Sequence, residues 1–377
     1  MESIRDKIDR IKARKMKVCI FGAGKMGTGF WYDMLKNLQI EPRYFCDNDP
    51  DKWGKEVKDG IRCISPGELT EKENCACFIL IGIFKINTIK KQLYDMGIET
   101  VVTFSDLYML DEVHRIFYSQ PYLYDEGLYR KRLEILEQGD ERKIEIWNPN
   151  NKKIAVYTCI TGNYEEVLEP KVISDECDYF VISDEKPKGT KIYQWIATKD
   201  VVPDWVEDHV RRNRYCKING GKIFKNYRYS IYIDGSDRII GDIGQYADRT
   251  GKCGIALRPH LLYPDLDVYT EAIQCVSCHL DEEDLIRWQI ESYRKENMPA
   301  NFGMFECGFI VRDHRNKLCQ EIMERWWKEV FTRSSRDQLS FTYCLWKSGM
   351  CACDVGIIGK GRLDGGVQGV TTVHYHH

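Results

Sequence analysis

Two carboxylates follow an apolar run in the second half of the sequence. Tyr229–Ile233 is apolar enough for a buried strand, and Asp234, Ser236 and Asp237 come after it. Such oxygens are the ligands that Mg²⁺ and Mn²⁺ prefer, and a cation held there could neutralise a departing diphosphate. An aspartate at a strand end is also a common turn cap, so a metal site and a structural cap are both open.

Basic residues lie just upstream of this strand. Arg211, Arg214 and Lys217 are spaced i, i+3, i+6, which places them on one side of a helix. Arginine binds phosphate through paired hydrogen bonds, so these side chains could clamp a phosphate. A solvated basic face is the alternative.

Further candidates lie nearer the C-terminus. Arg336, Asp337 and Gln338 open a predicted helix, where their side chains could be presented at its N-terminus. Glu306 is a candidate general base. A structural ion pair between Glu306 and Arg312 is the alternative role.

The ends of two other predicted strands carry candidate ligand-binding residues. Tyr157 and Thr158 end the first strand of the second half, where a nucleotide base could be stacked and hydrogen-bonded. His260 follows Pro259 near the end of a predicted strand and could orient a phosphate, or cap a loop.

A glycine motif stands near the N-terminus. Gly22, Gly24 and Gly27 follow the apolar run 17–21 and precede a predicted helix, and Asp47 ends the next strand. This arrangement fits a pyrophosphate at the helix N-terminus and a ribose at the aspartate, hence an NAD-type dinucleotide or another nucleotide. The alternative is a tight turn without a ligand. About 105 residues hold only half of a full dinucleotide-binding fold, which disfavours hydride transfer here.

Strand and helix patterns alternate along both halves of the chain. We expect strands near residues 17–21, 43–46, 77–81 and 100–104, then 154–158, 179–183 and 229–233, with helices at 284–295 and 317–331. Residues 148–152 form a strong breaker. The sequence therefore predicts an α/β protein with a small Rossmann-like parallel sheet in residues 1–125, a helical linker in 126–150 and a second α/β domain in 151–377.

Composition excludes several classes of protein. A net charge of −3 over 377 residues gives no basis for binding nucleic acid. No apolar stretch is long enough to span a membrane, and the charged N-terminus lacks a signal-peptide core. We expect a cytoplasmic protein, with peripheral attachment to the inner membrane face left open. Its 16 cysteines should then be mostly reduced, and Cys275-Val-Ser-Cys278-His279 is not expected to bind haem or zinc.

Six segments in one order resemble a known family. They are VYTCITGNYEEVLEPK, RRNRYCKI, YSIYIDGSDRIIGDI, ALRPHLLYPDLDVYTEA, MFECGFIVRDH and SSRDQLSF, spread over residues 154–345. The order resembles a glycosyltransferase-like family, once a domain of unknown function, that includes plant seed-mucilage transferases and bacterial surface-polysaccharide proteins. The runs FGAGKMG, CDNDPDKWGK and ISPGEL resemble small Rossmann-like modules that precede transferase domains in polysaccharide assembly.

The resemblance implies a GT-A-like domain, a nucleotide-sugar donor and a glycan or glycolipid acceptor. It also implies a divalent metal, at Asp234-Gly-Ser236 and Asp237, where such enzymes carry Asp-x-Asp. A late histidine completes the metal site in some of them, so His374, His376 and His377 are either ligands or a frayed tail. The functional positions that it implies are Thr158, Asn163, Arg211, Lys217, Asp234, Ser236, His260, Glu271, Glu306, Arg312, Arg336, Asp337 and Gln338.

Two other functions stay open at this point. The first is a metal-dependent hydrolase of a lipid or sugar, because one member of the wider family has been linked to ceramide hydrolysis. The second is a dinucleotide-binding enzyme or sensor that works through the N-terminal module. The sequence lacks the Gly-x-Ser-x-Gly and His-Glu-x-x-His motifs of common hydrolases. A glycosyltransferase of surface-polysaccharide biosynthesis is therefore the leading hypothesis.

Overall fold

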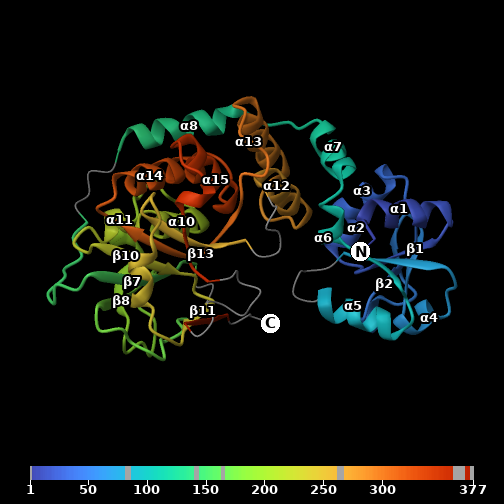
Figure 1. Cartoon of the computed structure of the whole chain (residues 1–377), viewed down its shortest axis with the longest axis horizontal. Coiled ribbons are helices and arrows are strands. Elements are labelled where there is room, and N and C mark those ends of the chain that lie inside the picture. The colour runs from blue at the N-terminus through green and yellow to red at the C-terminus, as the bar shows by residue number, and fades with distance from the viewer. Residues whose placement is uncertain are drawn as a thin grey trace. The chain divides into compact units, whose positions relative to one another are not determined.

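The chain divides into two compact units, each with a sheet of its own (Figure 1). A computed structural model describes residues 2–80, 86–139, 144–162, 166–260, 267–359 and 370–373. The first unit comprises residues 1–123 and 272–283, and the second comprises 124–271 and 284–377. Helix α8 (Glu126–Glu137), within the predicted linker, packs against α14 (Lys317–Thr332) of the second unit.

The first unit is built on a six-stranded sheet of order β3-β4-β2-β1-β5-β6. All neighbours pair in parallel except β3 with β4. The central strands are apolar and buried on both faces, as parallel strands under helices must be. The strands are β1 (Lys17–Phe21), β2 (Pro42–Cys46), β3 (Glu56–Lys58), β4 (Ile61–Ile64), β5 (Cys75–Ile79) and β6 (Thr100–Thr103).

Helices cover both faces of this sheet: α1 and α3 lie on one and α4 and α5 on the other (Figure 1). Ser65 and Glu68 form a capping box at the start of α4, with Pro66 as its first residue. The helices are α1 (Ile4–Ala13), α2 (Lys25–Thr28), α3 (Phe30–Asn37), α4 (Pro66–Thr70), α5 (Ile86–Asp95), α6 (Phe104–Leu107) and α7 (Asp111–Ser119).

The second unit has a mixed seven-stranded sheet of order β14-β12-β13-β10-β7-β8-β9. Strands β10, β7, β8 and β9 are parallel, whereas β13 runs antiparallel to both β10 and β12. The strands are β7 (Ile154–Ile160), β8 (Cys177–Ser183), β9 (Gln194–Ala197), β10 (Tyr229–Ile233), β12 (Ile255–Pro259), β13 (Phe305–Asp313) and β14 (Gly356–Ile357). A separate pair joins β11 (Asp237–Ile239) to β15 (Thr371–Val373).

Helices α10 (His209–Ile218), α14 and α15 (Gln338–Lys347) lie together on one side of this sheet (Figure 1). The remaining elements are α9 (Thr198–Val201), α11 (Gly220–Ile223), α12 (Val268–Ser277), which crosses into the first unit at Ala272, α13 (Glu283–Lys295) and short 3₁₀ turns that include η4 (Ala352–Asp354). Within the described part of the chain, every helix is too short or too polar to cross a bilayer.

The predicted fold class is confirmed. The strands near 17–21, 154–158, 179–183 and 229–233 and the two long helices form as expected, to within a few residues. The second unit has the α/β architecture expected of a GT-A-like domain, built here on a mixed sheet. The antiparallel strand β13 was not predicted, and it matters most for the site.

Candidate active site

The strand order brings separate sequence segments to one edge of the second sheet. Strand β10 ends at Ile233 on this edge, and Asp234 follows it. Because β13 is antiparallel to β10, Glu306 near the start of β13 lies at the same edge. Arg258 near the end of β12 is paired with Glu306. Helices α10 and α15 bring Lys217 and Asp337 to these strands, as their ion pairs demonstrate.

Lys217 links two carboxylates at this edge. Its ammonium nitrogen lies 2.6 Å from Asp337 Oδ2 and 3.4 Å from Asp234 Oδ1. The Lys217 and Asp337 side chains are each only 4% exposed, whereas that of Asp234 is 27% exposed. Tyr232 also donates its hydroxyl to Asp234 Oδ1, at 3.0 Å. Two donors therefore orient the Asp234 carboxylate, which is the one most open to a ligand.

The Asp337 carboxylate is held ionised in the interior. Burial by itself would raise the pKa of Asp337, but the charges of Arg214 and Lys217 outweigh it and hold the pKa well below its usual range. The Arg214 Nε lies 3.8 Å from Asp337 Oδ2. Asp337 also caps α15 by accepting from the Gln338 backbone N–H.

Arg258 forms the second ion-paired group at this edge. Its Nη2 lies 3.3 Å from Asp237 Oδ2, and neither side chain is exposed. Its Nε lies 3.8 Å from Glu306 Oε2. Glu306 is thus paired with Arg258, and the predicted pairing with Arg312 is wrong, because Arg312 donates to Tyr157, Ser230 and the Lys217 carbonyl instead. We call Arg214, Lys217, Asp234, Asp237, Arg258, Glu306 and Asp337 the charge cluster.

A glycine on β13 makes room for the charge cluster. A Cβ atom on Gly308 would lie 2.7 Å from Asp234 Oδ2 and 2.9 Å from Arg258 Nη2. The Asp234 backbone N–H donates to the Gly308 carbonyl at 2.8 Å. The bare backbone therefore allows the carboxylate and the guanidinium to approach the same point on the strand.

A family model matches the part of the chain that carries this cluster. The TOD1/MUCI70, glycosyltransferase-like domain matches residues 136–352, more than half of the chain. The chain belongs to this family. Every residue of the charge cluster falls within the matched range. Membership of the TOD1/MUCI70 family supports glycosyltransferase activity for the second unit.

A curated relative and two solved structures are similar to this chain. The Probable hexosyltransferase MUCI70 of Arabidopsis thaliana is 24% identical over 214 residues, which are 50% of this chain and 36% of that protein. This chain thus spans about a third of the length of the relative. The WbbM bifunctional glycosyltransferase is 12% identical with a TM-score of 0.34, and covers 54% of this chain and 40% of its own. An active-site mutant of LgtC is 11% identical with a TM-score of 0.28, and covers 50% and 69%.

Several other predicted residues of the TOD1/MUCI70 domain lie in the core. Tyr157 has no exposed surface, packs against Phe224 and Tyr232, and donates to the Cys216 and Lys217 carbonyls. A ring without exposed surface cannot stack on a donor base, so that prediction is corrected. Thr158, on the same strand, is also buried.

Arg211 is used by the protein itself. Its guanidinium donates to Asp208, to the Phe331 carbonyl and to the Arg333 carbonyl. Arg211 therefore links α10 to the end of α14. Of the three residues predicted to bind a phosphate, Arg214 and Lys217 remain as candidates.

Three further predicted positions lie at or near the same edge. His260 follows β12 and is buried, and burial lowers its pKa to about 4, so the ring is neutral near pH 7. Gln338 and Arg336 flank Asp337 and are partly exposed. Asn163 and the C-terminal histidines lie outside the described residues.

The predicted metal ligands differ in how well they fit a divalent cation. Asp234 offers a partly exposed carboxylate. Asp237 is fully buried and its cation is the Arg258 guanidinium, so it does not fit that role. Ser236 is buried beside them, with 9% of its surface exposed. Within the described ranges, the residues grouped closely enough for a metal are Cys351, Cys353 and Asp354, and the three predicted ligands are not among them.

Sequence reasoning passed over Arg258, Tyr232 and Gly308. Arg258 stands in ALRPH, inside a segment that resembles the family. A single arginine forms no spacing pattern with other charged residues, so the sequence does not single it out. Tyr232 reads as an ordinary strand residue. The signal for Gly308 was a glycine within the apolar run of β13, which suggests a close approach.

A cavity of about 410 Å³ lies at the opposite edge of the same sheet. Its lining includes Ile154, Glu176 and Tyr229, where β7, β8 and β10 begin. The charge cluster lies where β10 ends. Ligands of α/β sheets bind outside the carboxyl ends of parallel strands, so the charge cluster is the better candidate.

The glycine motif of the first unit is partly explained by the fold. Gly22 has φ of 118°, and a Cβ on Gly27 would lie 2.0 Å from the Gly22 carbonyl oxygen. A Cβ on Gly24 would meet nothing within 4 Å, so the turn itself does not require this glycine. The helix that follows, α2, is only four residues long. A nucleotide here stays a prediction.

Asp47 stabilises the loop that carries Gly22 and Gly24. Its carboxylate accepts from the Ala23 and Asp49 backbone N–H groups and from Lys52. Partial burial would raise the pKa of Asp47, but these donors lower it below the usual value. The acceptor predicted for a ribose thus already serves three donors of its own loop.

Proposed function

We propose that the second unit transfers a sugar, a hexosyl group or a related one, from a nucleotide-sugar donor to a glycan or glycolipid acceptor. One observation carries this proposal. Residues of the family-like segments on α10, β10 and α15, namely Lys217, Asp234 and Asp337, meet in one ion-paired cluster at the carboxyl end of β10. The similarity to a probable hexosyltransferase supports the same reaction class.

Asp234 would hold a divalent cation, Mn²⁺ or Mg²⁺, in this reaction. Its Oδ1 is oriented by Tyr232 and Lys217, and its side chain is the most exposed carboxylate of the cluster. When bound, such a cation neutralises the charge that develops on a departing diphosphate. Arg214 and Lys217 add positive charge to the same edge, and they fix the ionised Asp337 that caps α15.

Glu306 would accept the proton of the acceptor hydroxyl. Its side chain is 14% exposed and lies 3.8 Å from the Arg258 Nε. Arg258 is a positioning residue in this scheme, because it holds Glu306 and Asp237 from a fully buried place. Gln338, at the first turn of α15, would contact the transferred sugar or the acceptor.

The wider role is part of the same proposal. A place in surface-polysaccharide biosynthesis, at the cytoplasmic side of the inner membrane, is supported by the resemblance of the ordered segments to bacterial surface-polysaccharide proteins. An NAD-type dinucleotide or another nucleotide at the first unit is supported by Gly24, which the fold does not require.

The test is a screen of the full chain against nucleotide-sugars with and without Mn²⁺. We expect one nucleotide-sugar to raise the melting temperature more with Mn²⁺ than without it, since binding to the native state stabilises by mass action. With an oligosaccharide acceptor added, release of the nucleoside diphosphate should match sugar gained by the acceptor. Release of free sugar into water, with none on any acceptor, would favour the hydrolase and contradict the proposal.

A further inference from the structure

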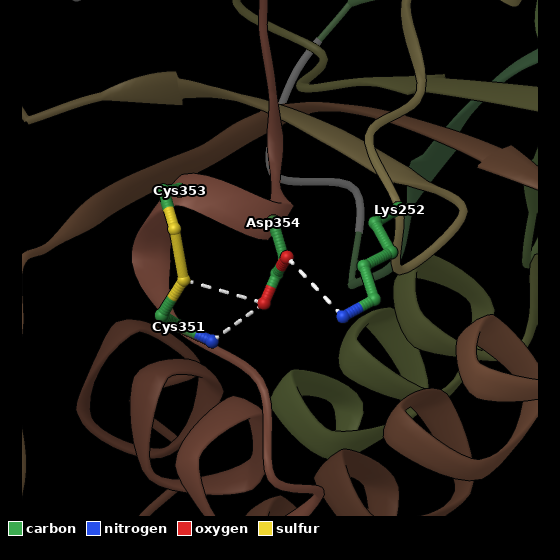
Figure 2. Close-up of a disulfide and its surroundings, with 4 residues drawn as sticks. All are labelled: Lys252, Cys351, Cys353 and Asp354. Atoms are coloured by element: carbon green, nitrogen blue, oxygen red, sulfur yellow. Dashed lines mark hydrogen bonds and ion pairs between the residues drawn. A yellow bond between two sulfur atoms is a disulfide. The ribbon is translucent and has the colours of Figure 1, made fainter.

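An accessible sulfur pair lies at η4 in the second unit, with Cys351 as its N-cap and Cys353 within it. Cys351 and Cys353 are joined by a disulfide that encloses only Ala352 (Figure 2). The other fourteen cysteines form no disulfide, and all of them except Cys75 and Cys278 are buried. Cys353, in contrast, is exposed. An external thiol can therefore reach this bridge, which is the one exception among cysteines that are otherwise mostly reduced, as expected.

This bridge is poorly placed to stabilise the fold. A disulfide restricts the unfolded chain more as the loop that it closes grows longer. Here the sequence separation is 2 residues, close to the smallest that a bridge can have. A structural staple would gain little from this spacing, so another role fits it better.

The surroundings of Cys351 suit the reduced state as well as the oxidised one. Asp354 Oδ2 accepts from the Cys351 backbone N–H at 2.9 Å and lies 3.3 Å from Cys351 Sγ (Figure 2). The Lys252 ammonium holds the other carboxylate oxygen at 3.9 Å. After reduction, the new S–H group of Cys351 would find an acceptor already in position.

We propose that Cys351 and Cys353 form a reversible thiol–disulfide exchange site for low-molecular-weight thiols. An external thiolate attacks the exposed Cys353 sulfur, the S–S bond breaks, and Cys351 leaves as a thiolate that takes up a proton. A second external thiol then displaces Cys353 from the mixed disulfide. In sum, two external thiols supply two electrons and two protons, and they leave as one external disulfide.

The site lies on the connection between two elements that reach the charge cluster. Helix α15 comes before this connection in the chain, and Asp337 caps the start of that helix. On the other side, β14 pairs with β12, the strand that carries Arg258. A Cβ on Gly356 would lie 1.8 Å from the Arg249 carbonyl oxygen, so β14 is packed tightly at its start. Reduction therefore releases the short connection and leaves β14 in place.

The full chain should be equilibrated in graded mixtures of reduced and oxidised glutathione, alkylated, and analysed by peptide mass at residues 351–353. We expect a change of about a hundredfold in [thiol]²/[disulfide] to convert the pair from about 90% disulfide to about 90% dithiol, as a two-electron couple requires. Cys353→Ser should abolish this transition, and the control Cys75→Ser should leave it unchanged.

Three outcomes would overturn the proposal. The bridge could persist in the folded protein under excess dithiothreitol, which would make it an inert structural link. The two cysteines could instead be alkylated in every mixture. The reduced pair could also retain added Zn²⁺ together with Asp354 and resist reoxidation, which would make it a metal site. None of these results depends on transferase activity.

Discussion

Charged side chains at the edge of the second sheet differ sharply in burial. Asp237 and Arg258 are fully enclosed, Lys217 and Asp337 nearly so, and Asp234 stands partly open. Buried charges are tolerated only when they are paired, and removal of one partner leaves a costly unpaired charge. The enclosed pairs are therefore suited to be a rigid support, and Asp234 is the member that we propose acts on a ligand.

Asp234→Asn should reduce turnover by at least about a hundredfold, or about 2.7 kcal/mol of transition-state stabilisation. The amide keeps an acceptor for the Tyr232 hydroxyl but removes the negative charge. The melting temperature should hardly move, because this side chain is partly exposed. Steady-state kinetics and thermal melts measure the two effects.

Asp313→Asn is the matched control for this variant. Asp313 is a partly exposed, ion-paired carboxylate at the other end of β13, beside Arg228. It should leave turnover unchanged. If Asp234→Asn unfolds the protein, or transfers sugar as fast as the parent, Asp234 is a structural cap.

Asp337→Asn should destabilise the protein in a pH-dependent way. Asparagine also caps helices, so the variant removes mainly the charge opposite Lys217. The folded-state pKa of Asp337 is depressed, so its stabilisation is present above the unfolded pKa of about 3.9 and is lost as pH falls below it. Urea unfolding should show a deficit of about 3 kcal/mol from pH 5 to 7 that shrinks towards pH 3. A deficit that is constant across this range would contradict the ionised pair.

For single residues, the sequence predicts which side chains are candidates better than it predicts their ion-pair and hydrogen-bond partners. Lys217, Asp234 and Asp337 can be predicted because charged residues stand out beside apolar runs. That Lys217 bridges the other two depends on how α10 and α15 pack, which no local pattern encodes. Tyr157 was misplaced for a related reason: its hydroxyl has buried carbonyls to donate to, and only the fold reveals them.

Strand β13 determines where the cluster forms. Because β13 is antiparallel to β10, Glu306 and Gly308 near its start lie beside the end of β10. Asp313, the last residue of β13, lies at the other edge of the sheet. The parallel strands β7 and β8 are predictable because both of their faces are buried and their sequences are mainly apolar. Strand β13 is interrupted by Glu306 and Gly308, which lie at the candidate site, and so the local pattern does not reveal it as a strand.

Gly308→Ala should impair the site while the protein stays folded. The atoms that a Cβ would meet belong to the ends of the Asp234 and Arg258 side chains and not to the backbone, and the partly exposed Asp234 has room to move. Their displacement by a few tenths of an ångström or more should lower turnover by at least about tenfold. Activity and circular dichroism are the measurements.

Gly221→Ala in α11 is the control, since its Cβ would make only ordinary contacts with His314 at 3.6 Å. This variant should retain full activity. Equal losses in the two variants would mean that the space beside Gly308 has no special role.

At the scale of the whole molecule, the two large sheets belong to two separate compact units. The alternation of strands and helices predicts two α/β domains, because each parallel crossover needs a helix. It does not predict that residues 272–283 join the first unit, because that segment carries no pattern that links it to the N-terminal sheet. Two units with separate sheets should also respond separately to changes made in one of them.

Scanning calorimetry of the full chain should therefore resolve two transitions. Gly27→Ala should lower the free energy of unfolding of the first unit by about 3 kcal/mol, and with it the temperature of that unit's transition. The reason is that the alanine Cβ would collide with the Gly22 backbone. Gly67→Ala, whose Cβ would meet only Ser65 Oγ at 3.8 Å, should leave that transition near its original temperature. A nucleoside diphosphate with Mn²⁺, at about a hundred times its dissociation constant, should raise the other transition by about 5–10 °C. If the nucleotide raises the transition that Gly27→Ala lowers, the donor binds in the first unit, and the charge cluster is not the donor site.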